Sequence, residues 1–334
     1  MQKNSFFDMN KGLKIILNIS IFALIAGFGY YMVRSMNSDK KTTRLGEERA
    51  ESAFVSPYKM INSFEFDSDV LGFDVNESFM SVALFDKVSV FDKSGKHQQD
   101  FRIETGVRDI ILEKNTAFLL YPMKIVSYIY FLEEKKQVWE ACSPNSDYVA
   151  ITTSEDYVFV TDAENKNIVQ YNKQGGLVRF IKSPNGFIIP SHTFDIININ
   201  DTIFVSNSGR HRIESYTLDG KFITSFGVSG AQAGAFAGCC NPVYLAATPG
   251  GNILTSEKGN PRISSYGKDG KFRTILFDSH TLGGGTNAYR MKVCGENIYV
   301  ANKKTILVYC RDAMCHVSTE KPCTKSCNGC PNKK

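Results

Sequence analysis

The sequence predicts an all-β fold, a six-bladed β-propeller preceded by one N-terminal transmembrane helix. Three observations predict it: an uncharged apolar run close to the N-terminus, short apolar–polar alternation with glycine turns through the rest of the chain, and a recurring sequence unit. Alternation with a period of two is typical of β-strands, and a repeat of about 40 to 50 residues is typical of propeller blades.

The apolar run covers residues 15–33 (IILNISIFALIAGFGYYMV) and contains no charged side chain. About 20 such residues in a helix span the hydrocarbon core of a bilayer. Basic residues flank the run on both sides, and Tyr30 and Tyr31 stand where an interfacial aromatic belt would lie. A cleaved signal peptide is the alternative, but no small-x-small site follows the run and no cysteine precedes Cys142 to accept a lipid. We therefore expect a single-pass, uncleaved membrane anchor.

The regions on either side of the anchor differ in character. Lysine and arginine are nearly balanced across it, so the positive-inside rule gives little bias. Because short N-terminal tails usually stay inside the cell, we expect residues 1–14 in the cytoplasm. Residues 34–56 read as a polar linker. We then expect a propeller over residues 57–316, on the extracytoplasmic side of the cell (inner) membrane, and a cysteine-rich tail over residues 317–334.

Six copies of one unit make up the propeller region. The clearest copies are DYVFVTDAENKNIVQYNKQGG from Asp156, DTIFVSNSGRHRIESYTLDGK from Asp201 and GNILTSEKGNPRISSYGKDGK from Gly251, and weaker copies begin at Ser78, Asn115 and Glu296. Each copy holds two alternating apolar runs, a polar turn, an aromatic residue and, in most copies, a glycine turn. Six such units predict six blades, because closure leaves few exposed sheet edges. A solenoid would need capping repeats, and none is evident.

The segments FVSNSGRHRIESYTLDGKF and GAFAGCCNPVYLAATPGGNILTSEKGNPRISSYGKDGKF resemble the NHL-repeat family. The resemblance extends over about residues 180–309. It implies a six-bladed propeller, and it also implies that Arg210, His211 and Arg212 are turn and packing residues rather than a catalytic cluster. The family includes lyases, receptors, scaffolds and binders of RNA or protein, so the resemblance does not decide the function.

Cys239 and Cys240 are extra residues within FAGCCNP, so the repeat does not explain them. Aligned blades place Cys142 and His192 at corresponding positions, before the first strand of their own blades. First strands line the central channel, so these connections would meet at one mouth. Residues that end the second strands (Asp162, Asn207, Glu257 and Asn302) would add an oxygen-rich ring nearby. The predicted channel-mouth candidates are Cys142, His192, Asn207, Cys239, Cys240 and Glu257.

Thiolate and imidazole groups suit zinc or copper, so Cys142, His192, Cys239 and Cys240 form one candidate metal set. Structural interpretations stand beside it: a vicinal disulfide, a buried Cys142 and a turn-capping His192. A second candidate set lies in the tail, where Cys315 precedes Cys323, Cys327 and Cys330 in the spacing C-x3-C-x2-C. An iron–sulfur cluster, zinc or disulfides would fit it, and an extracytoplasmic location favours disulfides. Nine cysteines cannot all pair within one chain.

Two functions fit these patterns, and no catalytic residue can be assigned. The net charge is +5, but the lysine and arginine residues are scattered among 34 acidic residues and form no long basic run. We therefore expect no nucleic-acid partner. No catalytic motif occurs in a supporting context, and Asp69, Asp74 and Glu77 read as solvated turn residues. The first hypothesis is therefore a membrane-anchored binding or assembly module for a protein partner, in a redox or envelope complex. The alternative is a redox or metal-binding protein, an electron carrier, lyase or oxidoreductase, with Glu257 handling a proton.

Overall fold

The computed structural model describes residues 23–30, 54–129 and 134–311, and the chain divides into two units, Met1–Val55 and Ser56–Lys334. Of the predicted anchor at residues 15–33, the described part is residues 23–30, which are helical. No helix within the described residues is long and apolar enough to cross a membrane. Residues 15–22 and 31–33 of the predicted anchor lie outside the described residues.

The second unit is an all-β propeller of six antiparallel sheets, each with four strands. In the first three blades, from the inner to the outer strand, the strands are β2 (Gly72–Val75), β3 (Phe79–Ala83), β4 (Lys87–Asp92) and β5 (His97–Arg102); β6 (Asp109–Glu113), β7 (Thr116–Tyr121), β8 (Lys124–Ile129) and β9 (Glu134–Glu140); and β10 (Tyr148–Thr153), β11 (Tyr157–Asp162), β12 (Asn167–Asn172) and β13 (Leu177–Ile181).

The remaining three blades repeat this order. Their strands are β14 (Ile196–Ile199), β15 (Thr202–Asn207), β16 (Arg212–Thr217) and β17 (Phe222–Phe226); β18 (Tyr244–Ala247), β19 (Ile253–Glu257), β20 (Arg262–Tyr266) and β21 (Phe272–Phe277); and β22 (Arg290–Cys294), β23 (Asn297–Asn302), β24 (Thr305–Arg311) and β1 (Tyr58–Glu65). Short 3₁₀ turns at Pro190–His192 (η1) and Ser208–Arg210 (η2) lie before β14 and before β16.

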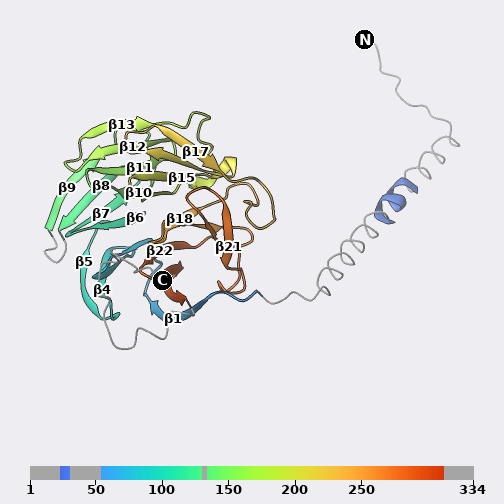
Figure 1. The fold of residues 1–334 in the computed structure, drawn as a ribbon, viewed down its shortest axis with the longest axis horizontal. Coiled ribbons are helices and arrows are strands. Elements are labelled where there is room, and N and C mark those ends of the chain that lie inside the picture. Colours follow the sequence, from blue (N-terminus) through green and yellow to red (C-terminus); the bar gives the residue numbers. More distant parts are fainter. Residues whose placement is uncertain (1–22, 31–53, 130–133, 312–334) are drawn as a thin grey trace, which may run out of the picture. The chain divides into compact units, whose positions relative to one another are not determined.

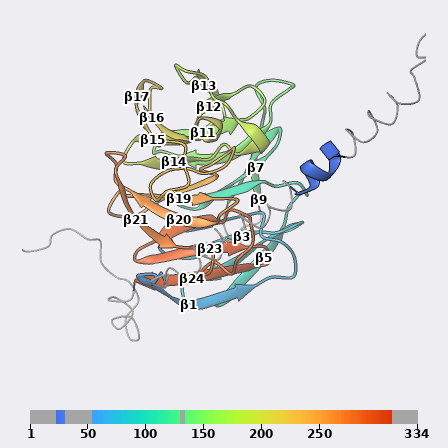
Figure 2. The same ribbon diagram turned by 90° about the vertical axis from the view of Figure 1, so that its right-hand side faces the viewer.

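The ring closes because the first strand of the propeller completes its last blade. β1 pairs antiparallel with β24, from Tyr58 opposite Arg311 to Glu65 opposite Thr305. Figure 1 and Figure 2 show β1, in blue, beside the orange and red strands from the C-terminal part of the chain. The inner strands β2, β6, β10, β14, β18 and β22 contact one another around the ring. The predicted six-bladed propeller is therefore confirmed.

One aromatic side chain per blade marks the repeat that the sequence predicts. Each lies on the third strand, opposite the second residue of the second strand (the first residue in the fifth blade), and each adjoins a β-bulge in the pairing with the fourth strand. The six are Phe91, Tyr128, Tyr171, Tyr216, Tyr266 and Tyr309. A bulge bends and twists the strand that carries it, so the recurring aromatic marks where every blade acquires its twist.

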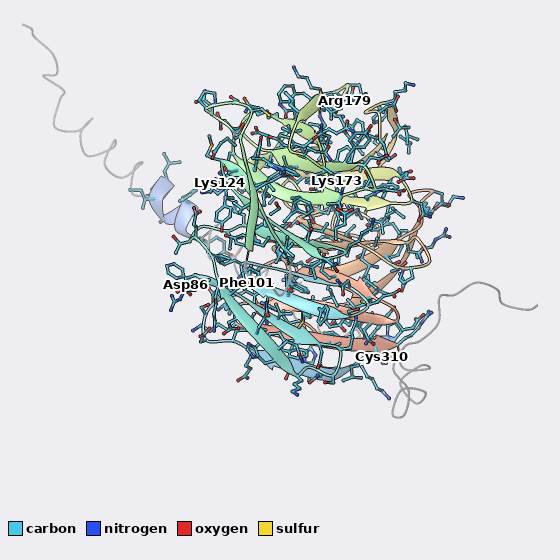
Figure 3. The ribbon with its side chains drawn as sticks, turned by 90° about the vertical axis from the view of Figure 1, so that its left-hand side faces the viewer. Asp86, Phe101, Lys124, Lys173, Arg179 and Cys310 are labelled. Carbon is cyan, nitrogen blue, oxygen red and sulfur yellow. The ribbon has the colours of Figure 1, made fainter. Side chains whose placement is uncertain are left out.

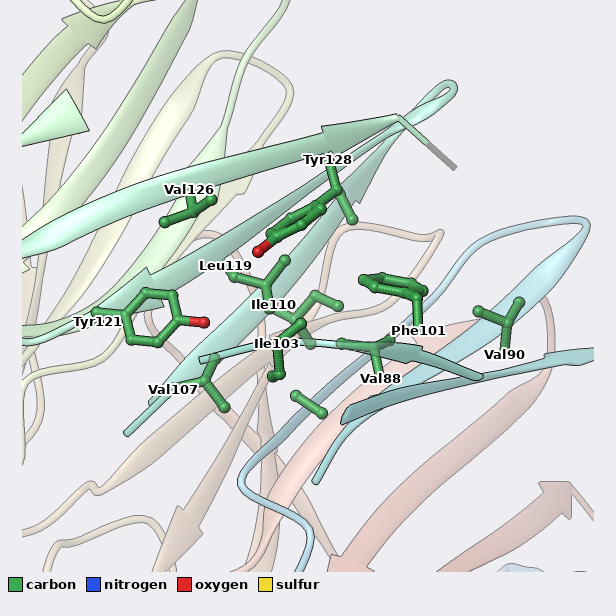
Figure 4. Close-up of a cluster of buried hydrophobic side chains, with 12 residues drawn as sticks. Val88, Val90, Phe101, Ile103, Val107, Ile110, Leu119, Tyr121, Val126 and Tyr128 are labelled. Atoms are coloured by element: carbon green, nitrogen blue, oxygen red, sulfur yellow. The ribbon is translucent and has the colours of Figure 1, made fainter. Parts of the chain in front are cut away.

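Apolar side chains fill the spaces between neighbouring blades. Figure 4 shows one such cluster, in which Val88 and Phe101 of the first blade face Leu119 and Tyr128 of the second. The ring centroids of Phe101 and Tyr128 are 5.5 Å apart. Removing these surfaces from water stabilises the stacking of one sheet on the next. Long polar side chains such as those of Lys124, Lys173 and Arg179 lie along the sheets in Figure 3.

Gly72, the first residue of β2, lets two inner strands approach closely. A Cβ atom there would lie 2.9 Å from the Cα of Asp109 and 3.1 Å from the amide nitrogen of Ile110. Both neighbours are backbone atoms of β6, which cannot rotate away. A side chain at this position would therefore have to push the first two blades apart.

We expect Gly72→Ala to lower the free energy of unfolding by about 1 to 3 kcal/mol, the usual range for overpacking at a rigid site. The matched control is Gly250→Ala, because a Cβ at Gly250 meets only the Thr248 hydroxyl oxygen at 3.9 Å. Urea denaturation of the full chain measures both effects. Equal stabilities of the two variants would contradict the close approach of β2 and β6.

Candidate functional site

All six inner strands begin at the same end of the propeller, and we call this end the mouth. The connections that enter the inner strands gather there. They comprise residues 66–71, 103–108, 141–147, 182–195, 227–243 and 278–289. β1 starts and β24 finishes at the opposite end, where Tyr58 pairs with Arg311. Among the described residues, the mouth is therefore built from connections and hairpin turns.

Residues at the ends of second strands fasten these connections in place. The Oδ1 atom of Asp162 accepts the backbone N–H of Asp147 at 3.0 Å. In the next blade, Asn207 accepts the N–H of Ile188 at 3.0 Å and donates to the Gly186 carbonyl at 3.2 Å. Both side chains are buried. Asn207, predicted as part of an open oxygen-rich ring, thus lies inside the structure and holds a loop.

Glu257 has the same role in the fifth blade. Its Oε1 atom lies 2.6 Å from Nε of Arg262, and its Oε2 atom accepts the N–H of Ala237 at 3.4 Å. Arg262 also donates to the carbonyl oxygens of Ala231 and Gln232. Glu257 is 1% exposed, and its charge is neutralised by Arg262. The structure therefore places it as a loop anchor, whereas a proton-handling group would need access to the channel.

His192 belongs to a chain of polar side chains that crosses the mouth. Its Nδ1 atom lies 2.6 Å from Oδ2 of Asp147, and the other oxygen of Asp147 pairs with the Arg108 guanidinium. These three residues come from the connections into the fourth, third and second blades. Ser191 and His192 both have positive φ, 56° and 54°. Successive left-handed residues are costly outside glycine and occur more often at functional sites than elsewhere.

The cysteine pair adjoins this chain through Ser191. The sulfur atoms of Cys239 and Cys240 are 3.0 Å apart; Cys239 is exposed and Cys240 is 1% exposed. Lys258 and Ser191 lie close enough to Cys240 to lower the pKa of its thiol. The connection that carries His192 thus lies next to Cys240 through Ser191.

Asn241 fixes the cysteine turn to the end of β19. Its Nδ2 donates to the carbonyl oxygens of Ala237 and Lys258 at 2.7 and 2.9 Å, and its Oδ1 accepts the Lys258 N–H at 2.9 Å. Three bonds from one buried amide tie together both sides of the site. Asn241 follows Cys240 directly, so it also sets the distance between Lys258 and the thiols.

Cys142 has a different environment from the other predicted mouth residues. Its sulfur lies 3.0 Å from the Tyr171 hydroxyl, and its N–H donates to the Tyr148 hydroxyl at 3.2 Å. Its hydrogen-bond partners are thus residues of the third blade, apart from His192 and the cysteine pair. Over the part of the chain that the structure describes, no three His, Cys, Asp or Glu side chains lie close enough to hold a metal ion. Cys315, Cys323, Cys327 and Cys330 lie outside the described residues, so the tail site stays a prediction.

The residues Arg210, His211 and Arg212 form a hairpin turn, as the resemblance implies. His211 caps η2 in the left-handed conformation, and Arg210 donates to the carbonyl oxygens of Asn185 and Gly186. A pocket of about 420 Å³ beside the turn is lined by Ile188, Arg210, Arg212 and Glu214 among others. Glu214 is buried and bound by the Asn207 side chain at 2.7 Å, so this pocket is an extension of the loop-fastening network.

Sequence reasoning missed a group of charged side chains in the channel. Arg290 of β22 reaches Oδ1 of Asp109 at 2.7 Å, and Lys292 lies 3.4 Å from Oδ1 of Asp74. Arg290 also lies over the Tyr244 ring, 5.0 Å from its centroid. Asp74 is 14% exposed and paired, so its interpretation as a solvated turn residue was wrong. The available signal was the spacing of Arg290 and Lys292, which alternation places on the same face of one strand.

Burial and mutual attraction shift the pKa values of this group. Burial raises the pKa of Asp74 despite Lys292 nearby, and it raises that of Asp195 to about 6 despite Arg290 and a hydrogen bond from the Leu245 N–H. For Lys292, attraction by Asp74 and the other carboxylates outweighs burial and raises the pKa. The group holds three carboxylates against two cations, so one carboxylate, Asp195, is left without a direct ion pair.

The architecture defines the class of this protein: a six-bladed β-propeller, a fold that suggests a binding or scaffold module but does not by itself decide the function. No family model and no curated protein matches the sequence, so the NHL assignment itself is not confirmed. Similar solved structures include a streptogramin B lyase (15% identity, 75% of this chain and 97% of that chain, TM-score 0.56). A virginiamycin B lyase from Staphylococcus aureus gives 15% identity over 76% and 99%, with a TM-score of 0.53. A protein of unknown function from Bacteroides thetaiotaomicron gives 13% over 76% and 72%, with 0.56. At these identities the likeness shows the fold alone.

Asp195 makes stability depend on pH in a defined direction. Its pKa is raised from 3.8 to about 6 in the folded chain, so between these values the folded state binds more protons than the unfolded state. Stability from this residue is therefore present below about pH 4 and is lost as pH rises to about 6, by up to about 3 kcal/mol. Asp195→Asn carries no charge and should lose this dependence.

Urea denaturation at several pH values, with Asp201→Asn as the exposed control, measures the effect. The free energy of unfolding of Asp195→Asn, relative to the unchanged protein, should rise between about pH 4 and pH 6. A difference that stays constant with pH would contradict the assignment.

A second prediction concerns the cysteine turn. Asn241→Ala removes three hydrogen bonds around buried groups, so we expect a loss of about 1 to 3 kcal/mol and faster alkylation of Cys240 by iodoacetamide. Asn252→Ala is the control, because only the backbone of Asn252 is hydrogen-bonded in the described contacts. Alkylation of Cys240 at the same rate in both variants would show that Asn241 does not hold the turn.

Proposed function

We propose that the protein is a membrane-anchored, extracytoplasmic binding module that docks a protein partner on the mouth of its propeller. The observation that carries the proposal is the fastening of the mouth loops by buried side chains, above all Asp162, Asn207, Asn241 and Glu257. Loops that are already ordered lose little conformational entropy when a partner binds. The mouth is thus a preorganised surface on a rigid scaffold.

The chemistry of the mouth favours a polar protein surface as partner. His192 is 67% exposed and the Arg108 guanidinium 34% exposed, and both are oriented by Asp147. Polar and charged side chains held in a fixed orientation determine how two partners align and make binding selective, more than they raise the affinity. A partner from a redox or envelope complex fits this surface, since an exposed thiol, Cys239, lies within it.

The strand order keeps the first and last strand ends of the propeller away from the mouth. β1 begins and β24 ends at the opposite end, where Tyr58 pairs with Arg311. The apolar, uncharged composition of residues 15–33 is what supports the anchor itself.

A photo-crosslinking amino acid tests the docking face in cells. Placed at His192 or at exposed Asn260, both at the mouth, it should form an adduct of the same mass, identified by mass spectrometry. Placed at Gln174 or Lys271, in turns at the opposite end, it should not. The same adduct from all four positions, or an adduct from the far-end positions only, would overturn docking at the mouth.

A redox function is the second candidate, and one observation favours it. The Cys239 and Cys240 sulfur atoms are 3.0 Å apart, beside a cationic side chain. Metal binding at this mouth and in the tail remains a prediction from the sequence. It would need ligands beyond those that the described residues bring together.

A further inference from the structure

The two sulfur atoms differ in access although they are neighbours in the chain. Cys239 is exposed at the mouth, and Cys240 is buried beneath it. An approaching molecule can therefore reach Sγ of Cys239 and is kept from Sγ of Cys240. A covalent bond between the two requires an approach of about 1 Å, because a disulfide is about 2 Å long.

The surroundings of Cys240 are suited to a negatively charged sulfur. Burial raises the pKa of Cys240. Interactions with Lys258, Cys239 and Ser191 lower it by a larger amount, so the net effect is a decrease. The hydrogen bond to Cys240 and the charge on that sulfur raise the pKa of Cys239. When the pair loses one proton, the charge therefore resides on Cys240 and the proton stays on Cys239. Lys258 is held there by Asn241.

We propose that Cys239 and Cys240 form a thiol–disulfide exchange site that accepts two electrons from the dithiol of a partner protein. The inference rests on the second candidate function. The division of roles follows from access and charge. Cys239 is the sulfur that the partner attacks, and Cys240 is the leaving group that Lys258 and Ser191 stabilise. Leaving-group thiols with low pKa depart faster in such exchanges.

The exchange balances without any further reagent. A thiolate of the partner attacks Sγ of Cys239; the Cys239–Cys240 bond breaks, and its electron pair leaves on Cys240. The second thiol of the partner then attacks the partner sulfur of the mixed disulfide and releases Cys239, which takes up a proton. The partner is oxidised to a disulfide, and the pair is reduced to the dithiol of the structure. A protein or small-molecule disulfide, by the reverse route, returns the pair to its oxidised form.

The full chain, equilibrated in mixtures of reduced glutathione and glutathione disulfide as the probe, tests the proposal. Residual thiols are alkylated and the peptide carrying both cysteines is weighed. We expect that peptide to carry two alkyl groups or none, with an internal disulfide in the second case. No internal disulfide at any glutathione ratio would overturn the proposal.

Single substitutions test the separate roles. In Cys240→Ser, glutathione should become trapped on Cys239, whereas Cys239→Ser should give no adduct because Cys240 is buried. Melting temperatures close to that of the unchanged protein show that both variants fold, and Cys142→Ser should behave as the unchanged protein. An adduct confined to Cys240 would contradict the assigned order of attack.

Lys258 is a positioning residue in this scheme, and its effect can be measured as a change in the equilibrium constant for reduction of the cysteine pair. Lys258→Met should lower the equilibrium constant for reduction of the pair by glutathione roughly tenfold, because the reduced pair loses the cation that stabilises its thiolate. Lys271→Met, at an exposed lysine far from the mouth, is the control. An unchanged constant for Lys258→Met would overturn its role. Neither experiment needs a docked partner, so loss of photo-crosslinks alone would leave the redox site standing.

Discussion

The pairing of β1 with β24 is the constraint on which the rest of the structure depends. Those two strands come from opposite ends of the propeller sequence, and their seven paired positions close the ring. Only a closed ring presses the six inner strands together, and only then do Arg290 and Asp109, from the sixth and second blades, lie 2.7 Å apart. An open array would leave both charges in water. The polar channel is thus a consequence of closure.

The rigidity of the mouth arises from one local device used in several blades. A polar residue at the end of the second strand turns inward and binds the backbone of the incoming connection, as Asp162, Asn207 and Glu257 do. Buried backbone groups must find partners, and a connection has no strand beside it to supply them. The side chain satisfies them and fixes the loop at the same time. A surface useful for recognition therefore follows from the requirement to satisfy buried polar groups.

Charge placement distinguishes the channel from the cysteine turn. In the channel, cations and carboxylates neutralise each other, and the unpaired Asp195 has its pKa raised by burial. At the cysteine turn a single cation, Lys258, adjoins a buried thiol, and the net effect on the pKa of Cys240 is a decrease. The direction of each pKa shift thus depends on whether burial or the neighbouring groups have the larger effect: burial dominates for Asp74 and Asp195, and the neighbouring groups dominate for Cys240.

The sequence by itself determined the all-β class, the six repeats and the aromatic residue of each third strand, because alternation and repetition are local patterns that a strand must show. It also pointed to Cys239 and Cys240, since these residues depart from the repeat. The tertiary structure decided the rest. It placed Asn207 and Glu257 as buried loop anchors, gave Cys142 a hydrogen-bond partner within its own blade, and revealed Asp74 and Lys292 as an ion pair in the channel. These contacts join residues distant along the chain, and which side chains meet across a closed ring depends on the register and spacing of all its blades, which no local pattern records.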